Sequence, residues 1–267
     1  LMELENDGYS ADSAVAELAG ALTAARGESM RIGEGDATAP RYVHLDANLR
    51  SLGNDAIAVG LIYRADRVQP VGPALHLDDK PFDDDSRVPL AQAFVLSQYG
   101  GAQPVLVVAN HFKSKGCGDA DAANADLGDG QSCFAAVRSE SARRLYEWLR
   151  DMPSGLEQTL ILGDLNAHTR EDPVRLLVGR GFVDVLERQG GSESYSYVFA
   201  GRAGRLDHAL AGSALAQRVK AVGIWHINAD ELPEFDYDGD ARSGRRLYNA
   251  DPYRSSDHDP VWVDITP

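Results

Sequence analysis

Gly163-Asp164-Leu165-Asn166 directly follows the short apolar run Leu160 to Leu162. Two other polar segments adjoin apolar, β-like runs in the same way. They are Asn110-His111-Phe112-Lys113-Ser114-Lys115-Gly116 after Val105 to Ala109, and Ser256-Asp257-His258-Asp259-Pro260 before Val261 to Ile265. Strands hold side chains rigidly, so several strands of one sheet can direct such residues at a common site. The sequence therefore predicts one polar site at strand ends, with Gly163 allowing the chain to turn where its strand stops.

These segments contain the residue types that phosphate-ester hydrolysis needs. Two histidines, two acidic residues and an amide can hold a divalent metal and supply an acid and a base beside it. A phosphodiester resists attack because its negative charge repels nucleophiles, so a cation and a positioned base are both required. We predict His258 as the general base, because the ordinary pKa of histidine is close to neutral. Asp164 and Asn166 are expected to position water or metal and to contact the phosphate.

The composition of the chain indicates one globular α/β domain. Its 267 residues are 43% hydrophobic, and no linker rich in Pro, Gly or Ser divides them. No run of about eighteen apolar residues is present, so no membrane span is predicted. The net charge of −15 disfavours non-specific adhesion to nucleic acid or anionic lipid. It does not exclude a nucleic-acid substrate, because a bound cation can invert the local field.

Apolar periodicity gives a mixed pattern of strands and helices. Helices are predicted over Ser10 to Arg26, over Phe134 to Met152 and after Asp172-Pro173, whereas the Pro- and Asp-containing segment Val71 to Ser86 is predicted to be a loop. The predicted strands are Arg41 to Leu45, Ala56 to Tyr63, Ala91 to Leu96, Val105 to Ala109, Leu160 to Leu162, Tyr195 to Phe199, Leu206 to Leu210, Val222 to His226 and Val261 to Ile265. This pattern favours two packed sheets with helices outside them over a doubly wound parallel sheet.

The two cysteines, Cys117 and Cys133, flank a polar stretch rich in Asp, Ala and Gly. One interpretation is that both are reduced thiols of a cytosolic protein and that their positions are unrelated. A disulfide fits better, because it would close the loop that follows the His111 segment, with a stabilisation of about 3 kcal/mol for about fifteen residues. We therefore predict an oxidising location, either secreted (extracellular) or periplasmic. The chain opens at Leu1 inside what reads as a strand end, so the absence of a visible signal peptide is uninformative.

Several motifs resemble one known superfamily. Gly163-Asp164-Leu165-Asn166, Leu206-Asp207-His208 and Ser256-Asp257-His258-Asp259-Pro260 resemble motifs of the endonuclease/exonuclease/phosphatase superfamily. The Asn110 to Gly116 segment, Tyr195-Ser196-Tyr197-Val198-Phe199 and Arg254-Ser255-Ser256-Asp257-His258 resemble its secreted bacterial extracellular deoxyribonucleases. The motifs stand in the family's order over essentially the whole chain. The resemblance implies a four-layer α/β/β/α sandwich of two packed mixed sheets, formed by residues 1–267 as a single catalytic domain.

The same resemblance implies the roles of individual residues. Leu1-Met2-Glu3 matches the family's metal-binding Glu motif, so Glu3 is expected to hold Mg²⁺ or Mn²⁺ with Asp257 as a second ligand. Glu5 is a rival ligand. Family members usually begin with an earlier strand that ends in Asn, so we expect the N-terminal strand of the core to be missing here. Asp207 would accept a hydrogen bond from His258, and His111 would donate to a phosphate oxygen or assist the leaving group.

Cationic side chains are expected to complete the substrate site. Arg87 resembles the family's phosphate-contacting arginine, although a solvated loop residue is an equal alternative. Lys113 and Lys115 alternate after His111 and are predicted to face the substrate groove. Tyr195 and Tyr197 are candidates for stacking on a sugar or base, but aromatic residues at this spacing are more often core. The loop with Asp121, Asn124, Asp126 and Asp129 is a candidate for a structural Ca²⁺, but its spacing is not that of an EF-hand and a solvated acidic loop is favoured.

The function that these features favour is a metal-dependent phosphodiesterase, a secreted nuclease that cleaves DNA, and RNA as a second substrate, with little sequence specificity. None of the cationic candidates would read base identity. One alternative is a phospholipid or inositol-phosphate phosphoesterase on the same scaffold, and another is a catalytically silent binding module. We expect nucleic acid, mainly DNA, as the partner, with no membrane contact and a monomeric state.

Overall fold

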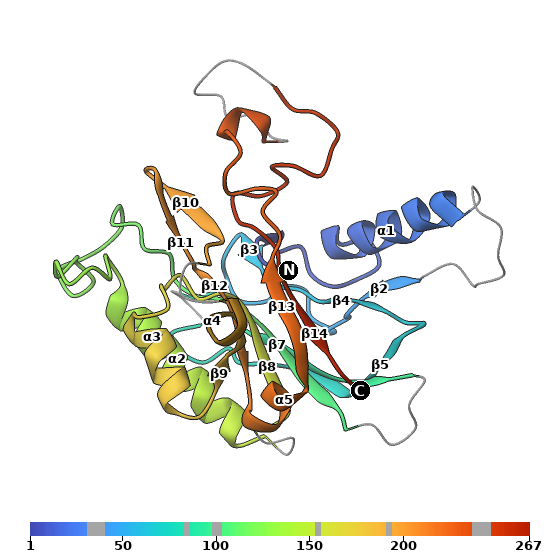
Figure 1. Cartoon of the computed structure of the whole chain (residues 1–267), viewed down its shortest axis with the longest axis horizontal. Helices are drawn as coiled ribbons and strands as arrows, with labels where there is room; N and C mark the ends of the chain where they lie inside the picture. The colour runs from blue at the N-terminus through green and yellow to red at the C-terminus, as the bar shows by residue number, and fades with distance from the viewer. Residues whose placement is uncertain (31–40, 83–85, 98–102, 153–155, 191–193, 237–246) are drawn as a thin grey trace.

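A six-stranded mixed sheet lies at the centre of the molecule (Figure 1). The computed structural model describes residues 1–30, 41–82, 86–97, 103–152, 156–190, 194–236 and 247–267. Across the sheet the strands are β5 (Val68–His76), β6 (Leu90–Leu96), β7 (Val105–His111), β8 (Thr159–Asp164), β12 (Asp207–Ala211) and β9 (Val183–Asp184). Strands β7 and β8 are parallel, and the other neighbouring pairs are antiparallel.

The other strands of the described chain form two-stranded pairs. They are β1 (Leu4–Glu5) with β3 (Ile57–Ala58), β2 (Tyr42–His44) with β4 (Ile62–Arg64), β10 (Tyr197–Phe199) with β11 (Arg202–Gly204), and β13 (Val219–Ile224) with β14 (Val261–Ile265). The helices are α1 (Ala14–Met30), α2 (Ala135–Arg150), α3 (Asp172–Gly179), α4 (Val185–Gly190), α5 (Ser213–Arg218) and the short 3-10 helix η1 (Pro233–Phe235). None of the helices described here is long and apolar enough to cross a membrane.

Both faces of the central sheet are buried. In β8, Ile161 lies in the core that includes Leu145 of α2 and Leu177 of α3. Its neighbour Leu160 lies in a second core, against which Val263 of β14 packs. Alternate side chains of a strand point to opposite faces, so α2 and α3 cover one face of the sheet and the β13–β14 pair covers the other. The predicted α/β sandwich is confirmed, with a second layer built from short strand pairs.

The predicted loop over Val71 to Ser86 is wrong for its first part. Strand β5 continues to His76 and includes both Pro70 and Pro73. It is the edge strand of the sheet, where one side of the backbone has no partner to bond and proline is tolerated. Its pairing with β6 shifts register between Val71 and Leu75, which accommodates the second proline. Residues 83–85 of the predicted loop lie outside the described residues.

Candidate active site

Strand register brings three of the predicted site residues into one row. The β7–β8 pairing places His111 beside Asp164, and the β8–β12 pairing places Asp164 beside Asp207. Gly163 makes this approach possible, because a Cβ at that position would lie 2.0 Å from the carbonyl oxygen of Asn110. We predicted a turn at Gly163, but this residue lies inside β8 with φ of 130°, and its role is the close approach of two backbones.

His258 joins this row from the segment before β14. Its Nδ1 donates a hydrogen bond of 2.7 Å to Oδ2 of Asp207, so the predicted pairing is present. The hydroxyl of the fully buried Ser196 donates to the same carboxylate oxygen at 2.7 Å. Because Nδ1 is engaged with Asp207, Nε2 is the ring nitrogen left for chemistry in the cavity. The role of Ser196 was not predicted, because it falls within the predicted strand Tyr195 to Phe199; in the structure it directly precedes β10.

The cluster of acidic groups shifts two pKa values. Burial alone lowers the pKa of His258, but the hydrogen bond to Asp207 and the negative charges of Asp207, Asp164 and Asp257 outweigh it and raise this pKa to about 9. Burial, followed by the charge on Asp207, raises the pKa of Asp164 to about 8. Ionisation of Asp164 is therefore unfavourable beside the other carboxylates, and a bound cation would stabilise the ionised form.

His111 differs from His258 in its charge. Burial, followed by the positive charges of Arg87 and His258, lowers the pKa of His111 to about 3. His111 is therefore neutral at physiological pH, with Nε2 3.5 Å from Oδ2 of Asp164. Its Nδ1 is buried without a hydrogen-bond partner among the residues that the structure describes. A neutral imidazole can donate one N–H, which suits the predicted contact with a phosphate oxygen better than proton donation by an imidazolium.

Asn166 is held in place by its neighbours. Its backbone N–H donates to Oδ1 of Asp164 at 2.6 Å, and its side-chain amide donates to Oδ2 of Asp164 and to the carbonyl of Phe112. This pattern fixes the loop after β8, where Asn166 has a φ of 47°. Its side-chain N–H donors are engaged in this structure, so the predicted phosphate contact would require at least one of these bonds to exchange.

Glu3 and Asp257 are the predicted metal ligands, and both line the main cavity. Withdrawal from water and then the charge of Asp257 raise the pKa of Glu3, so the two carboxylates lie close enough to repel. Mg²⁺ keeps several waters and is usually bound by one or two carboxylates, so this hard-oxygen donor set fits it. Within the described chain, no group of three or more His, Cys, Asp or Glu side chains is arranged to hold a metal ion. The rival ligand Glu5 is not among the residues that line the cavity.

The main cavity has a volume of about 670 Å³. The predicted residues that line it are Glu3, Arg87, His111, Lys115, Asp164, Asn166, Asp257 and His258. Asp207 lines an adjoining small pocket with Glu3, His111, Asp164 and His258. The predicted catalytic, phosphate-binding and metal-binding residues thus lie around one space, with Lys113 as the exception. Of the two tyrosines considered for stacking, Tyr197 lines the cavity and Tyr195 is not among the described lining residues. Three further residues line the cavity that were not predicted from the sequence: Phe199 and Arg202 of the β10–β11 hairpin, and His168.

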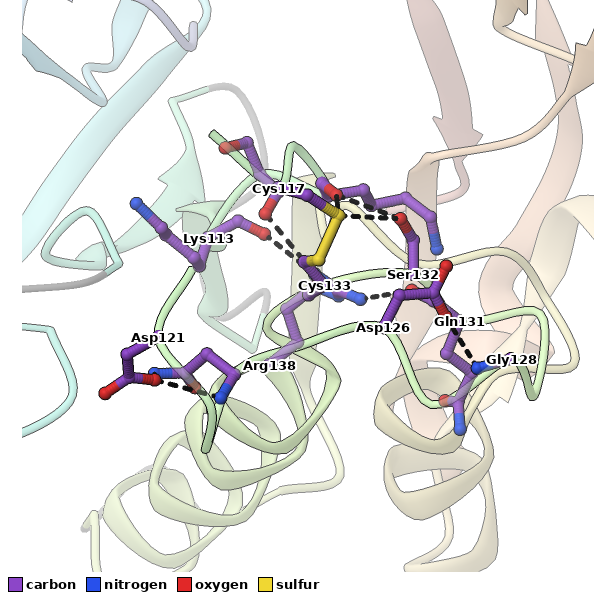
Figure 2. Close-up of a disulfide and its surroundings, with 12 residues drawn as sticks. Lys113, Cys117, Asp121, Asp126, Gly128, Gln131, Ser132, Cys133 and Arg138 are labelled. Carbon is purple, nitrogen blue, oxygen red and sulfur yellow. Dashed lines mark hydrogen bonds between the residues drawn. A yellow bond between two sulfur atoms is a disulfide. The ribbon is translucent and has the colours of Figure 1, made fainter. Parts of the chain in front are cut away.

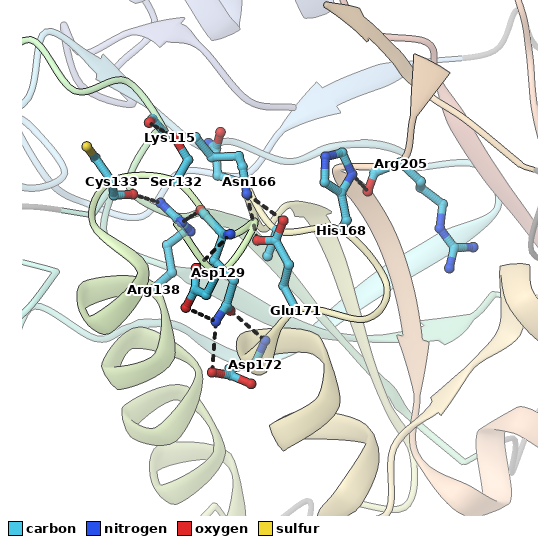
Figure 3. Close-up of polar contacts among 12 residues, drawn as sticks. Lys115, Asp129, Ser132, Cys133, Arg138, Asn166, His168, Glu171, Asp172 and Arg205 are labelled. Carbon is cyan, nitrogen blue, oxygen red and sulfur yellow. Dashed lines mark hydrogen bonds and ion pairs between the residues drawn. The ribbon is translucent and has the colours of Figure 1, made fainter. Parts of the chain in front are cut away.

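The two lysines after His111 point in different directions. The ammonium of Lys115 lines the cavity and lies 2.6 Å from both carboxylate oxygens of Glu171 (Figure 3). The ammonium of Lys113 lies over the ring of Phe134, 4.6 Å from its centroid, and Lys113 is not among the described lining residues. The chain after His111 is not a strand, so the spacing of two residues does not place both lysines on one face. The prediction that both face the groove is therefore wrong for Lys113. Arg87 lines the cavity and has its Nε 3.0 Å from Oδ2 of Asp55.

The predicted disulfide Cys117–Cys133 is present, with a Cα–Cα distance of 5.3 Å (Figure 2). The fully buried Arg138 of α2 braces the same loop, because its guanidinium donates to the carbonyls of Gln131 and Cys133. The aspartates proposed for Ca²⁺ are used in local turns. Asp121, Asp126 and Asp129 each accept backbone N–H groups two or three residues ahead. The favoured interpretation, a solvated acidic loop, agrees with these contacts.

Comparisons with known proteins place the chain in a family. Two solved structures of Bacteroides thetaiotaomicron are similar to it. One is a mannosyl-6-phosphatase, at 18% identity and a TM-score of 0.55, covering 84% of this chain and 76% of that one. The other is an endonuclease/exonuclease/phosphatase family protein, at 16% identity and a TM-score of 0.54, covering 83% and 74%.

A third structure, an endonuclease/exonuclease/phosphatase from Bacteroides vulgatus, has 12% identity and a TM-score of 0.51, covering 84% of this chain and 75% of that one. At these identities the likeness shows the fold. The comparison with curated protein sequences gives no match. The family model described as Endonuclease/Exonuclease/phosphatase family matches residues 11–258, which is most of the sequence. The chain therefore belongs to the endonuclease/exonuclease/phosphatase family of hydrolases that act on phosphoester bonds.

Proposed function

We propose that this chain is a secreted, divalent-metal-dependent nuclease that cleaves the phosphodiester bonds of DNA with little sequence preference. The observation that carries the proposal is the 2.7 Å contact between His258 and Asp207 beside the carboxylates of Glu3 and Asp257. Arg87 and Lys115 line the same cavity and supply positive charge for a phosphate backbone.

The residues of the cavity have separate tasks in this proposal. Asp207 holds the Nδ1–H of His258 and thereby leaves Nε2 free to take a proton from water. His111, which is neutral, donates a hydrogen bond to a phosphoryl oxygen. Glu3 and Asp257 would hold Mg²⁺ or Mn²⁺. When bound, such a cation would neutralise phosphoryl charge and lower the pKa of nearby groups, including His258.

A nucleic-acid substrate agrees with the cavity better than a lipid does. Among the described lining residues, Phe199 is the one large apolar side chain that is exposed, and a single ring is a weak anchor for a membrane. Arg87, Lys115 and Arg202 all line the cavity, and several cations suit a substrate with successive phosphates. The disulfide supports a secreted or periplasmic location, because such bonds persist in oxidising compartments.

A plasmid assay tests this function. The full chain with Mg²⁺ or Mn²⁺ is expected to nick supercoiled plasmid, and EDTA is expected to stop the reaction. His258→Ala should lower the rate by roughly 10²- to 10⁴-fold, the usual contribution of a general base. Cleavage that survives chelation would contradict the metal requirement. Hydrolysis of inositol phosphates or sphingomyelin without nicking of plasmid would instead identify the alternative phosphoesterase, and no turnover of any of them would indicate a silent binding module.

A further inference from the structure

The main cavity extends beyond the catalytic residues. On one side it is lined by Cys117 and Ser132 of the loop closed by the disulfide, and by Ser114, Lys115 and Gly116 just before that loop. On the other side it is lined by the β10–β11 hairpin. Both elements project on the same side of the molecule (Figure 1). None of the catalytic roles described above uses this outer part of the cavity.

The hairpin has a geometry that fixes its side chains. Ala200 and Gly201 join β10 to β11 and have φ values of 49° and 73°, as in the tight type I′ turn that suits a two-residue hairpin. Phe199 and Arg202 are direct cross-strand partners. Directly opposed residues of an antiparallel pair lie on the same face. The ring and the guanidinium are therefore presented together, and both line the cavity.

Aromatic rings lead outward from the catalytic histidine along β10. The ring of Tyr197 lies 4.5 Å from the ring of His258, measured between centroids. The ring of Phe199 follows at 6.3 Å from Tyr197, with only 11° between the two planes. Phe199 is 69% exposed, so it contributes little to the core. Single exposed apolar residues are common, but this ring lies nearly parallel to that of Tyr197 and lines the cavity.

Positive charge accompanies these rings. Arg202 is exposed, and no hydrogen bond or ion pair to another described residue is formed by its guanidinium. Across the cavity, Glu171 holds the ammonium of Lys115 at 2.6 Å. An exposed π face beside a free guanidinium is the combination that binds single-stranded nucleic acid, in which bases stack on aromatic rings and cations contact the phosphates.

We propose that Phe199 and Arg202 form a subsite for a nucleotide next to the scissile phosphate, in which the base stacks on Phe199 and the flanking phosphate contacts Arg202. This inference rests on the proposed nuclease function and adds to it a preference for strands with unpaired bases. A base inside a duplex has both faces covered by its neighbours and cannot stack on Phe199. The chain therefore binds single-stranded DNA more tightly than duplex DNA of the same length.

Binding without catalysis tests the subsite directly. The anisotropy of a fluorescein-labelled single-stranded oligothymidylate is measured with the full chain in EDTA. Phe199→Ala is expected to raise Kd by about tenfold, the usual loss for one stacked base, and Phe199→Trp is expected to restore binding. Arg202→Ala should also weaken binding and lower the slope of log Kd against log salt by about one. Leu127→Ala is the matched control, because Leu127 is 80% exposed and does not line the cavity.

Hydrolysis of bis(4-nitrophenyl) phosphate, a small phosphodiester without a base, separates this subsite from the proposed function. Unchanged hydrolysis in Phe199→Ala, together with weakened oligothymidylate binding, supports both. If Phe199→Ala hydrolyses bis(4-nitrophenyl) phosphate and binds oligothymidylate with the wild-type Kd, the proposed subsite is wrong and the proposed nuclease function is unaffected. If oligothymidylate binding depends on Phe199 but the wild type hydrolyses neither oligothymidylate nor bis(4-nitrophenyl) phosphate, the proposed nuclease function is wrong and the subsite stands. Equal loss of both readouts in Phe199→Ala and Phe199→Trp would mean that the hairpin only supports His258, and the subsite would be wrong.

Discussion

The two ends of the cavity are held in place by different means. At the catalytic end, His111, Asp164 and Asp207 stand on three neighbouring strands of a buried sheet, and their separation is set by strand register. At the outer end, the walls are an exposed hairpin and a loop without regular structure, and that loop is closed by the Cys117–Cys133 disulfide. A sheet fixes reacting groups precisely enough for catalysis, whereas surface loops vary without disturbing it. This difference predicts that substitutions at one end of the cavity change its function without changing that of the other end.

The largest separate effect is expected at the catalytic end. Asp207→Asn removes the negative charge that raises the pKa of His258 and replaces the carboxylate with a neutral amide, which is a weaker acceptor for the Nδ1–H. We expect kcat to fall by roughly 10²- to 10⁴-fold, with little change in the Kd for oligothymidylate. The measurement is steady-state hydrolysis beside anisotropy. Asp264→Asn is the control, because Asp264 is exposed on β14 and lines no part of the cavity. A loss smaller than about tenfold would show that His258 does not depend on Asp207.

The second effect is expected at the outer end. Replacement of both Cys117 and Cys133 by Ala should lower the free energy of unfolding by about 3 kcal/mol, because the unfolded chain is no longer constrained. It should also raise KM for DNA while kcat for bis(4-nitrophenyl) phosphate is unchanged, since strand register does not depend on this loop. Denaturant titration and the two kinetic assays measure these changes. An equal fall of kcat for both substrates would show that the disulfide supports the catalytic residues as well, and the contrast between the two ends would fail.

The same contrast explains what could be predicted from sequence. The residues at strand ends were identified from short polar motifs next to apolar runs, because strand register converts such motifs into spatial neighbours. His258 and Asp207 meet as predicted, and both cysteines are bonded. The second half of strand β5 was predicted to be a loop because of its proline content. Proline indicates a loop unless the strand is known to lie at the edge of its sheet, as β5 does.

Loop residues were harder to place. Lys113 and Lys115 look equivalent in the sequence, and the difference arises from Phe134 and Glu171, which contact them from other elements. Phe199 was read as part of a strand, and nothing in its immediate neighbours shows that its ring remains exposed. Tertiary contacts determine where these side chains point and how exposed they are, and the periodic pattern of the sequence carries no information about those contacts.

The pH dependence of stability is expected to report on the catalytic end, with a smaller effect. In the folded chain the pKa of His258 is raised to about 9, so its contribution is fully present below about pH 6.5 and is lost as pH rises through 9. The pKa of Asp164 is raised from 3.8 to about 8, so the folded state also loses stability as pH rises across that range. Both groups act in the same direction.

We therefore expect the free energy of unfolding in EDTA to fall by about 1–3 kcal/mol between pH 6.5 and 9. Denaturant titrations at a series of pH values measure this change. His258→Gln keeps a polar side chain without a titrating group in this range and should make the profile shallower, with the contribution of Asp164 remaining. The Cys117 and Cys133 double variant should keep the wild-type slope, because the loop contributes none of these charges. A profile that rises with pH would contradict the assigned shifts.

The smallest expected effect distinguishes two neighbouring side chains of the outer wall. Lys115→Ala removes a cation that lines the cavity and leaves the buried carboxylate of Glu171 without its partner, so KM for DNA should rise by about fivefold. Lys113→Ala removes an ammonium that lies over Phe134, outside the described lining, and KM should stay within about twofold of the wild type. The same steady-state assay measures both, and each variant is the control for the other. An equal rise of KM in both variants would mean that the two lysines act only through the overall charge of the protein. The difference in their positions relative to the cavity would then have no effect on DNA binding.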